Sequence, residues 1–209
     1  MDVFLKHKVT AKPQESELLT VAIIGSASGK GQPEQEQLLT ADLWEWMCEQ
    51  AETYVRSLGD WSKINLVSGG ASWSDHLAIY LHLTHPQTHL TLHLPCLWDE
   101  GRKQYLETDG THWAKNPGRI SNWYHRKFSQ VINQNSLEQL HSVITQSSPN
   151  ITIKSHYKGF HDRDLVVGRC QHLLAFSFSK TSEPTDGGTS YTWKHSPCPN
   201  KTHRSLYRI

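Results

Sequence analysis

Residues 19–24 read LTVAII, an apolar run rich in β-branched residues. Such a run predicts a central strand that is buried on both faces, as in a parallel sheet. The run stops at Gly25 and continues as SASGKGQ to residue 32. A strand that ends in a glycine-rich loop is a common way to hold a phosphate, because free backbone N–H groups there face the ligand. The stretch therefore bears on both the fold and the ligand.

The elements that follow alternate between helix and strand. An amphipathic pattern begins at Pro33 and predicts one helix that ends near Gly59, with apolar positions Leu39, Leu43, Met47, Ala51, Tyr54 and Leu58. Short apolar runs predict strands at 63–70 and 89–95, separated by a helix at 74–85. This order is typical of a right-handed parallel α/β sheet, so we expect a Rossmann-like parallel sheet with helices on both faces.

Residues 98–135 depart from this rhythm, because they are polar and carry Gly and Pro among several aromatic residues. We expect an aromatic-rich excursion with some helix that covers one end of the sheet as a lid or binding loop; a misread helical segment is the alternative. Beyond it the pattern predicts a helix at 136–144 with Ser136 as N-cap, a strand at 150–156, a helix at 162–170, a strand at 172–178, a helix start within 185–196 and a last strand at 201–209. Residues 1–209 are expected to form one domain.

Composition and charge argue against several classes of function. Hydrophobic residues make up 36% of the chain and charged residues 20%, and the formal net charge is +1. This balance argues against nucleic acid or an anionic membrane as a partner. No apolar run reaches the roughly 18 residues of a membrane span. Residues 1–16 lack the apolar core of a signal peptide, so a cytoplasmic protein is expected.

Neither cysteine nor histidine forms a metal-binding pattern. The cysteines are far apart and include no CxxC pair, which favours free thiols in a reducing compartment. They are Cys48, Cys96, Cys170 and Cys198. Four histidines cluster at His82, His85, His89 and His93. The last two share a strand face about 13 Å apart, too far for one ion. We therefore expect no metal and no cofactor.

The loop after residues 19–24 matches neither common nucleotide fingerprint. A P-loop needs GxxxxGK followed by Ser or Thr, but Gly25 and Gly29 are too close together and Gly31 stands where the hydroxyl should be. The dinucleotide pattern GxGxxG fails because Ser26 and an alanine follow Gly25. Taken alone, the loop is equally consistent with a turn that carries a solvated Lys30.

Two further glycine turns follow predicted strands, one at 68–71 and one at 186–189. In a parallel sheet all strand C-termini lie along one edge, and ligands bind there at the point where the strand order reverses. We therefore predict that the three turns converge on one site for a nucleotide-type small molecule. The expected ligand-binding residues are Gly25, Ser26, Ser28, Ser68, Gly69, Gly70, Gly187, Gly188 and Thr189.

Four segments resemble the SLOG superfamily. They are VAIIGSAS at 21–28, LVSGGASWSDHLA at 66–78, RDLVVGRCQHLLAFS at 163–177 and DGGTSYT at 186–192. That superfamily includes the Rossmann domain of DNA-processing protein A, the Lonely Guy and lysine decarboxylase-like phosphoribohydrolases, and nucleotide sensors of antiviral systems. The resemblance covers residues 19–94 and 150–196. It implies a Rossmann-like fold and a nucleotide or nucleotide-derived ligand.

The resemblance also implies candidate catalytic residues. In the phosphoribohydrolases an Arg precedes the penultimate motif strand, and Arg163 occupies a similar place. Those enzymes carry PGGxGTxxE, whose Glu assists N-glycosidic cleavage, whereas Trp193 or Lys194 stands near that place here. Asp75 or Asp186 is then the substitute carboxylate.

The sequence leaves three functions open. The first is a sensor or binding protein that holds a nucleotide without turning it over, which the three glycine turns and the missing Glu favour. The second is a hydrolase that cleaves the N-glycosidic bond of a nucleoside monophosphate. The third is DNA binding, against which the net charge of +1 and the lack of a basic stripe argue. Many members of the superfamily are dimers, so a homodimer is expected.

Overall fold

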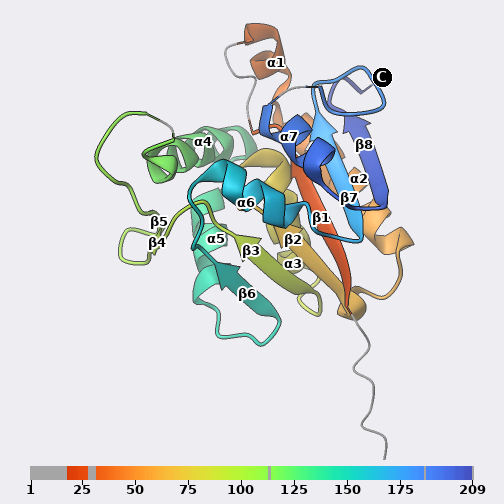
Figure 1. The fold of residues 1–209 in the computed structure, drawn as a ribbon, viewed down its shortest axis with the longest axis horizontal. Coiled ribbons are helices and arrows are strands. Elements are labelled where there is room, and N and C mark those ends of the chain that lie inside the picture. The colour runs from red at the N-terminus through yellow and green to blue at the C-terminus, as the bar shows by residue number, and fades with distance from the viewer. Residues whose placement is uncertain (1–17, 28–31, 113, 186, 209) are drawn as a thin grey trace, which may run out of the picture.

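The computed structural model describes residues 18–27, 32–112, 114–185 and 187–208, and these residues confirm the predicted fold class. They form a six-stranded sheet in which every pair of neighbouring strands is parallel (Figure 1). Its strands are β1 (Leu19–Gly25), β2 (Ile64–Ser68), β3 (His89–His93), β6 (Ile151–Lys154), β7 (His172–Ser177) and β8 (Asn200–Ser205). The expectation about targeting rests on residues 1–16, which lie outside the described part of the chain.

The sheet order is β6-β3-β2-β1-β7-β8, and it reverses at β1. The chain adds β2, β3 and β6 outward on one side of β1 and then returns to the other side for β7 and β8 (Figure 1). In this register Val21 of β1 lies opposite Leu66 of β2, and Ile23 lies opposite Leu174 of β7. The switch point therefore lies between β1 and β7, where α/β sheets bind ligands.

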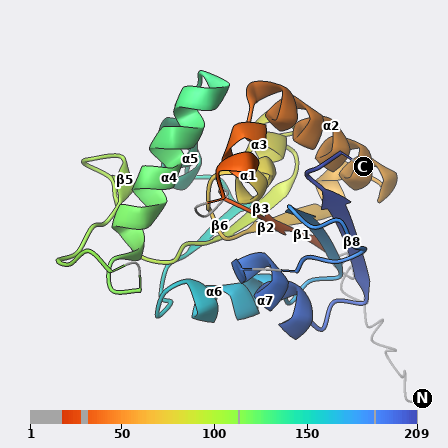
Figure 2. The ribbon, with the colours of Figure 1, turned by 90° about the horizontal axis from the view of Figure 1, so that it is seen from above.

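Helices cover both faces of the sheet, as predicted (Figure 2). One face carries α2 (Ala41–Ser57), α3 (His76–Thr84) and α5 (Ser136–Thr145), and the other carries α6 (Phe160–Val167) and α7 (Gly187–His195). Val21 and Ile23 of β1 pack in the core under the first group, whereas Ala22 and Ile24 pack in the core under the second. Because successive strand residues point to opposite faces, the run LTVAII supplies both cores.

The helix predicted between Pro33 and Gly59 is two helices. α1 (Pro33–Leu38) ends before Thr40, and α2 begins after it. The Thr40 hydroxyl accepts a hydrogen bond from Leu43 N at 3.2 Å, which caps the start of α2. Apolar spacing continues across the break, so periodicity alone does not reveal it.

The predicted N-cap Ser136 is wrong by one residue. Ser136 is the first residue of α5, and the cap is Asn135, whose Oδ1 accepts a hydrogen bond from Glu138 N at 3.1 Å. Asn and Ser both serve well as N-caps, so residue type alone does not distinguish Asn135 from Ser136.

The excursion at 98–135 contains a hairpin and a long helix. β4 (Trp98–Asp99) and β5 (Gln104–Tyr105) pair antiparallel, and α4 (Pro117–Ile132) follows and packs on α5. Tyr105, His125 and Phe128 are fully buried, and the Asn122 amide forms two hydrogen bonds of 2.9 Å with the backbone of Tyr105. The alternative of a hidden helical segment is thus confirmed, and the excursion is anchored in the core. Its role as a lid stays a prediction.

Candidate functional site

The loop after β1 meets both the loop after β2 and the end of β7. Ser26 N donates to Phe176 O at 3.0 Å, and Ser26 O accepts from the Ser74 hydroxyl at 3.3 Å. Gly25 leaves no room for a side chain, since a Cβ there would overlap Ser74 Oγ and Phe176 O. The first and second glycine turns therefore pack against each other beside the switch point.

The third glycine turn is connected to the second through α6. A Cβ on Gly69 would overlap Arg163 Nη1, and a Cβ on Gly188 would lie 3.4 Å from Asp164 Oδ2. Two adjacent residues of α6 thus touch the turn after β2 and the first turn of α7. We term three segments the C-terminal loop cluster, because they lie at or after the C-terminal ends of β1, β2 and β7: residues 25–27, 68–75 and 187–189. The structure brings the three turns together at the edge that the parallel topology indicated.

Arg163 lies between two carboxylates beside Gly69. Its Nη1 donates to Asp75 Oδ2 at 3.2 Å, and its Nε lies 3.0 Å from Asp164 Oδ1 in an ion pair whose angle is unfavourable for a hydrogen bond. The exposed fractions of the side chains are 7% for Arg163, 9% for Asp75 and 12% for Asp164. These three residues are termed the buried triad. Removing charges from water is costly, so each member depends on its partners for compensation.

Burial also sets the ionisation of the triad. Desolvation raises the pKa of Asp75 to about 6; Arg163 opposes this rise and the nearby Asp164 carboxylate adds to it. For Arg163, burial alone would lower the pKa, but Asp164 and Asp75 together raise the pKa above its ordinary value. The guanidinium therefore stays charged, and the pKa of Asp75 lies closer to neutral pH than that of an exposed carboxylate.

The local backbone directs Asp75 toward Arg163. Asp75 ends a short 3₁₀ helix (Trp73–Asp75) and precedes α3, yet among the described residues its side chain makes no capping hydrogen bond to that helix. Trp73 is only 3% exposed and has a φ of 58°, a left-handed conformation that bulky residues rarely adopt. The Asp75 carboxylate therefore does not cap α3 and instead contacts Arg163 and the backbone of the Gly69 turn.

Two predicted ligand-binding residues, Ser68 and Gly70, make close contacts within the protein. The fully buried Ser68 hydroxyl donates to Asp75 O at 2.7 Å and accepts from Gly70 N at 3.0 Å. A Cβ on Gly70 would lie 2.6 Å from Tyr105 Oη and 2.7 Å from Leu94 Cδ2. Gly70 also has a φ of 71°, which favours glycine. The glycine at this position is thus explained by packing and turn geometry rather than by room for a ligand.

Tyr105 and His125 of the excursion contact the second glycine turn, although neither is among the predicted ligand-binding or catalytic residues. Gly70 O accepts hydrogen bonds from the Tyr105 hydroxyl and from His125 Nε2, the latter at 3.0 Å. His125 Nδ1 lies 2.9 Å from Ser136 Oγ. Burial lowers the pKa of His125 to about 3, so the ring is neutral and donates through Nε2. No motif marks these residues, because they act on the turn from a segment that the resemblance does not cover.

The remaining predicted residues are at the start of α7 or outside the described structure. Gly187 begins α7 with a φ of 62°, and Thr189 is buried in its first turn. Both therefore stand where helix N–H groups lack intrahelical partners. Ser28 and Asp186 lie outside the described residues, so the proposed role of Asp186 as a carboxylate stays a prediction.

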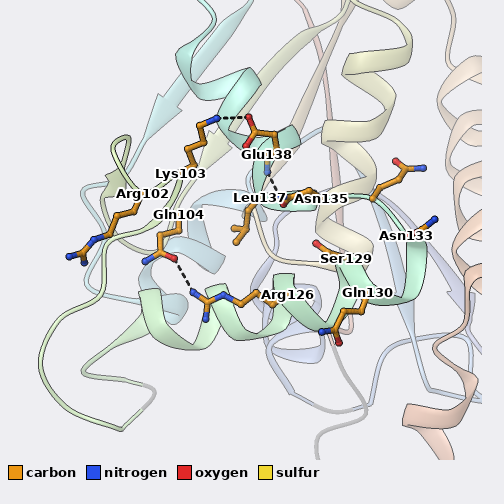
Figure 3. A pocket seen from close by; sticks show the side chains of 11 residues that line it. Arg102, Lys103, Gln104, Arg126, Ser129, Gln130, Asn133, Asn135, Leu137 and Glu138 are labelled. Carbon is orange, nitrogen blue, oxygen red and sulfur yellow. Dashed lines mark hydrogen bonds and ion pairs between the residues drawn. The ribbon is translucent and has the colours of Figure 1, made fainter.

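A surface groove of about 670 Å³ is lined by β5, the second half of α4 and the start of α5 (Figure 3). None of the described residues that line it belongs to the predicted site. Its cations have local partners: Lys103 Nζ contacts Glu138 Oε1 at 2.8 Å, and Arg126 Nη2 donates to Gln104 Oε1 at 2.9 Å. These contacts are largely exposed, so water screens them.

Metal-binding and membrane-spanning features were searched for in the described part of the chain. Its His, Cys, Asp and Glu side chains include no group of three or more that could hold a metal ion. Its helices include none that is long and apolar enough to cross a bilayer.

The chain belongs to the same family as a viral protein. It is 31% identical over 190 residues to the uncharacterized protein R261 of Acanthamoeba polyphaga mimivirus, and the alignment covers 90% of this chain and 96% of that relative. No family model matches the chain, and no solved structure matches it. The family therefore spans nearly the whole chain, and the resemblance to the SLOG superfamily stays a prediction.

Proposed function

We propose that the protein binds a nucleotide or nucleotide-derived small molecule at the C-terminal loop cluster. The observation that carries the proposal is the buried triad beside the Gly69 turn. Burying three charged groups rarely improves stability, because desolvation can exceed the gain from pairing. Ionisable groups with perturbed pKa values gather at functional sites. The position beside the switch point supports the same conclusion.

The loop cluster offers different chemistry to different parts of a nucleotide. N–H groups at the start of α7 suit phosphate oxygens, since glycines at 187 and 188 permit close approach and the helix dipole favours an anion. The carboxylates of Asp75 and Asp164 suit ribose hydroxyls, which donate to them. Arg163 then acts by orienting both carboxylates. Its direct contact with a phosphate stays a prediction, because two carboxylates already pair with it.

A second candidate function is hydrolysis of the N-glycosidic bond of a nucleoside monophosphate, and Asp75 favours it. A carboxyl group with a pKa of about 6 can hold a proton near neutral pH and give it to a leaving base. In that reaction the bond between ribose C1′ and the base nitrogen breaks. Water supplies the hydroxyl that C1′ gains and a proton that ends on the base.

A thermal-shift screen against nucleoside mono-, di- and triphosphates tests both functions when each mixture is then analysed by chromatography. We expect at least one nucleotide to raise the melting temperature of the wild type. Recovery of that nucleotide unaltered supports binding, and release of free base with ribose phosphate supports hydrolysis. If no nucleotide shifts the melting temperature or is cleaved, both proposals are wrong.

Substitution of Asp75 connects the screen to the site. Asn keeps the shape of Asp75 but removes the charge, so we expect Asp75→Asn to weaken binding of the identified nucleotide at least tenfold, about 1.4 kcal/mol. Asp42→Asn is the control, because Asp42 is an exposed carboxylate in the first turn of α2. Equal affinity of Asp75→Asn and wild type would show that Asp75 is structural and would remove the main support for the proposal.

A further inference from the structure

Cys170 and Cys198 occupy equivalent positions before two neighbouring strands. β7 and β8 pair in parallel, with His172 opposite Asn200. Each cysteine stands two residues before its member of this pair. In a parallel register, residues two positions earlier lie on the same face and beside each other. The register therefore places the two cysteines opposite one another.

Contacts on either side of the cysteines extend this register beyond the strands. Ser196 Oγ donates to Gly168 O at 2.6 Å, and a Cβ on Gly168 would lie 3.2 Å from Ser196 Cβ. Nearer the strands, Asn200 Nδ2 donates to Gln171 O at 3.0 Å. The two chain segments thus run side by side both before and after the cysteines.

The side chains of the two cysteines lie in the same hydrophobic cluster. Cys198 is buried in the core under α6 and α7, and Cys170 packs against that core. Burial, the electrostatic effect of Cys198 and a hydrogen bond to its thiol raise the pKa of Cys170 to about 12. Both residues are free thiols, as are Cys48 in α2 and Cys96 before β4.

We propose that Cys170 and Cys198 form a dithiol that a small-molecule disulfide converts to an intramolecular disulfide. One cysteine sulfur attacks the small disulfide and releases a small thiol; the second cysteine then attacks the mixed disulfide and releases the other. Two protein S–H bonds are lost, one S–S bond forms, and the small disulfide is reduced to two thiols. Neighbouring strands lie about 4.8 Å apart, within the roughly 4.4–6.8 Å between Cα atoms that a disulfide needs.

The bond would join α6, which contacts the loop cluster, to α7, whose first turn belongs to it. Cys170 follows α6, which holds Arg163 and Asp164, and Cys198 follows α7, whose first turn holds Gly188. The cysteines lie beyond the C-terminal ends of these helices, and the loop cluster lies at their N-terminal ends. Oxidation therefore fixes α6 and α7 relative to each other by a bond at the N-terminal ends of β7 and β8, opposite the loop cluster. It also closes a loop in the unfolded chain, which stabilises the folded protein.

Equilibration of the full chain in glutathione redox buffers tests the proposal. Incubation continues until protein that starts oxidised and protein that starts reduced reach the same ratio of disulfide to thiol. This takes time because a thiol with a raised pKa exchanges slowly. Free thiols are then alkylated, and the intact mass and the peptide map are measured. In the oxidising buffer we expect two cysteines to resist alkylation without carrying glutathione, and the map to join 170 to 198. The reducing buffer should reverse this.

Single variants sharpen the test. We expect Cys170→Ser and Cys198→Ser each to lose the protected pair, whereas the control Cys48→Ser keeps it. Oxidised wild type should also melt at a higher temperature than the reduced protein. Four alkylated thiols at equilibrium with excess oxidised glutathione would overturn the proposal. So would a glutathione adduct on either cysteine in place of the internal bond, or a map that joins another pair.

Discussion

The buried triad and the groove show two ways in which this protein brings opposite charges together. Lys103 and Glu138 at the groove approach to 2.8 Å, closer than any contact within the triad, but their side chains are 49% and 50% exposed. The side chains of the triad are at most 12% exposed. Distance alone would rank the groove pair as the stronger one. Solvent reverses that order, because water screens the exposed pair while buried charges depend on each other.

The pKa values of Glu138 at the groove and Asp75 in the triad differ in the same way between exposed and buried surroundings. At the groove, hydrogen bonding to Lys103 lowers the pKa of Glu138, as an exposed ion pair is expected to do. In the triad, desolvation overrides the attraction of Arg163 and raises the pKa of Asp75. A hollow on the surface is therefore a weaker indication of function here than a buried carboxylate beside a glycine turn.

The largest expected effect comes from removing the cation of the triad. Arg163→Leu leaves two buried carboxylates without their partner, so we expect the free energy of unfolding at pH 7 to fall by about 3–5 kcal/mol. Urea denaturation measures this loss. Arg169→Leu is the control, since Arg169 is an exposed residue just after α6. A loss below about 1 kcal/mol for Arg163→Leu would mean that the triad behaves like a surface pair.

A smaller effect is expected when the triad is displaced rather than broken. In Gly69→Ala the new Cβ overlaps Arg163 Nη1, so the guanidinium must move away from Asp75. We expect destabilisation of about 1–3 kcal/mol, measured by urea denaturation. Gly101→Ala is the matched control, because a Cβ there meets only Asp99 Oδ1 at 3.5 Å. Equal stability of the two variants would contradict the close contact between Gly69 and Arg163.

The pH dependence of stability tests the raised pKa of Asp75. Its unfolded pKa is about 3.9, below the folded value of about 6, so the folded protein binds more protons between these values. The stabilising contribution of protonated Asp75 is present below about pH 4 and is lost as pH rises through about 6. Asp75→Asn has no such loss. Between pH 4 and 7, the unfolding free energy of the wild type should therefore fall by roughly 2–3 kcal/mol relative to that of Asp75→Asn. A difference that does not change with pH would show that the carboxylate is hydrated.

The smallest effect is expected at the groove. Lys103→Met removes the exposed partner of Glu138, and we expect a change in melting temperature within the error of the measurement. A clear drop, comparable with that of Gly69→Ala, would mean that the groove pair is shielded from water and that the contrast between the two regions does not hold.

The parallel sheet could be predicted from the sequence because apolar runs bounded by Gly or Pro mark strands. LTVAII at 19–24 is the clearest case, since a strand covered on both faces needs no polar residue. α4 was hidden for the opposite reason. It buries Asn122 and His125, which hydrogen-bond the backbone of Tyr105 and Gly70. Because these buried positions are polar, they interrupt the apolar periodicity that marks the buried face of an amphipathic helix.

The candidate site was predictable only in part. The convergence of the glycine turns followed from parallel topology, whereas the pairing of Asp75 with Arg163 joins residues far apart in the chain and depends on burial. Asp164 is adjacent to Arg163 in the sequence, but adjacency does not show that both side chains are buried. Gly70 was assigned to a ligand, although Tyr105 fills the space beside it, because nothing in the sequence places the excursion against that turn.

Hydrogen–deuterium exchange with a saturating nucleotide from the screen tests most directly whether the C-terminal loop cluster is the binding site. We expect exchange to slow in residues 68–76, 160–168 and 187–190, which carry the second and third glycine turns and the triad. Residues 126–138, which line the groove, should exchange at the same rate with and without nucleotide. Slower exchange confined to residues 126–138 would place the ligand in the groove and contradict the account.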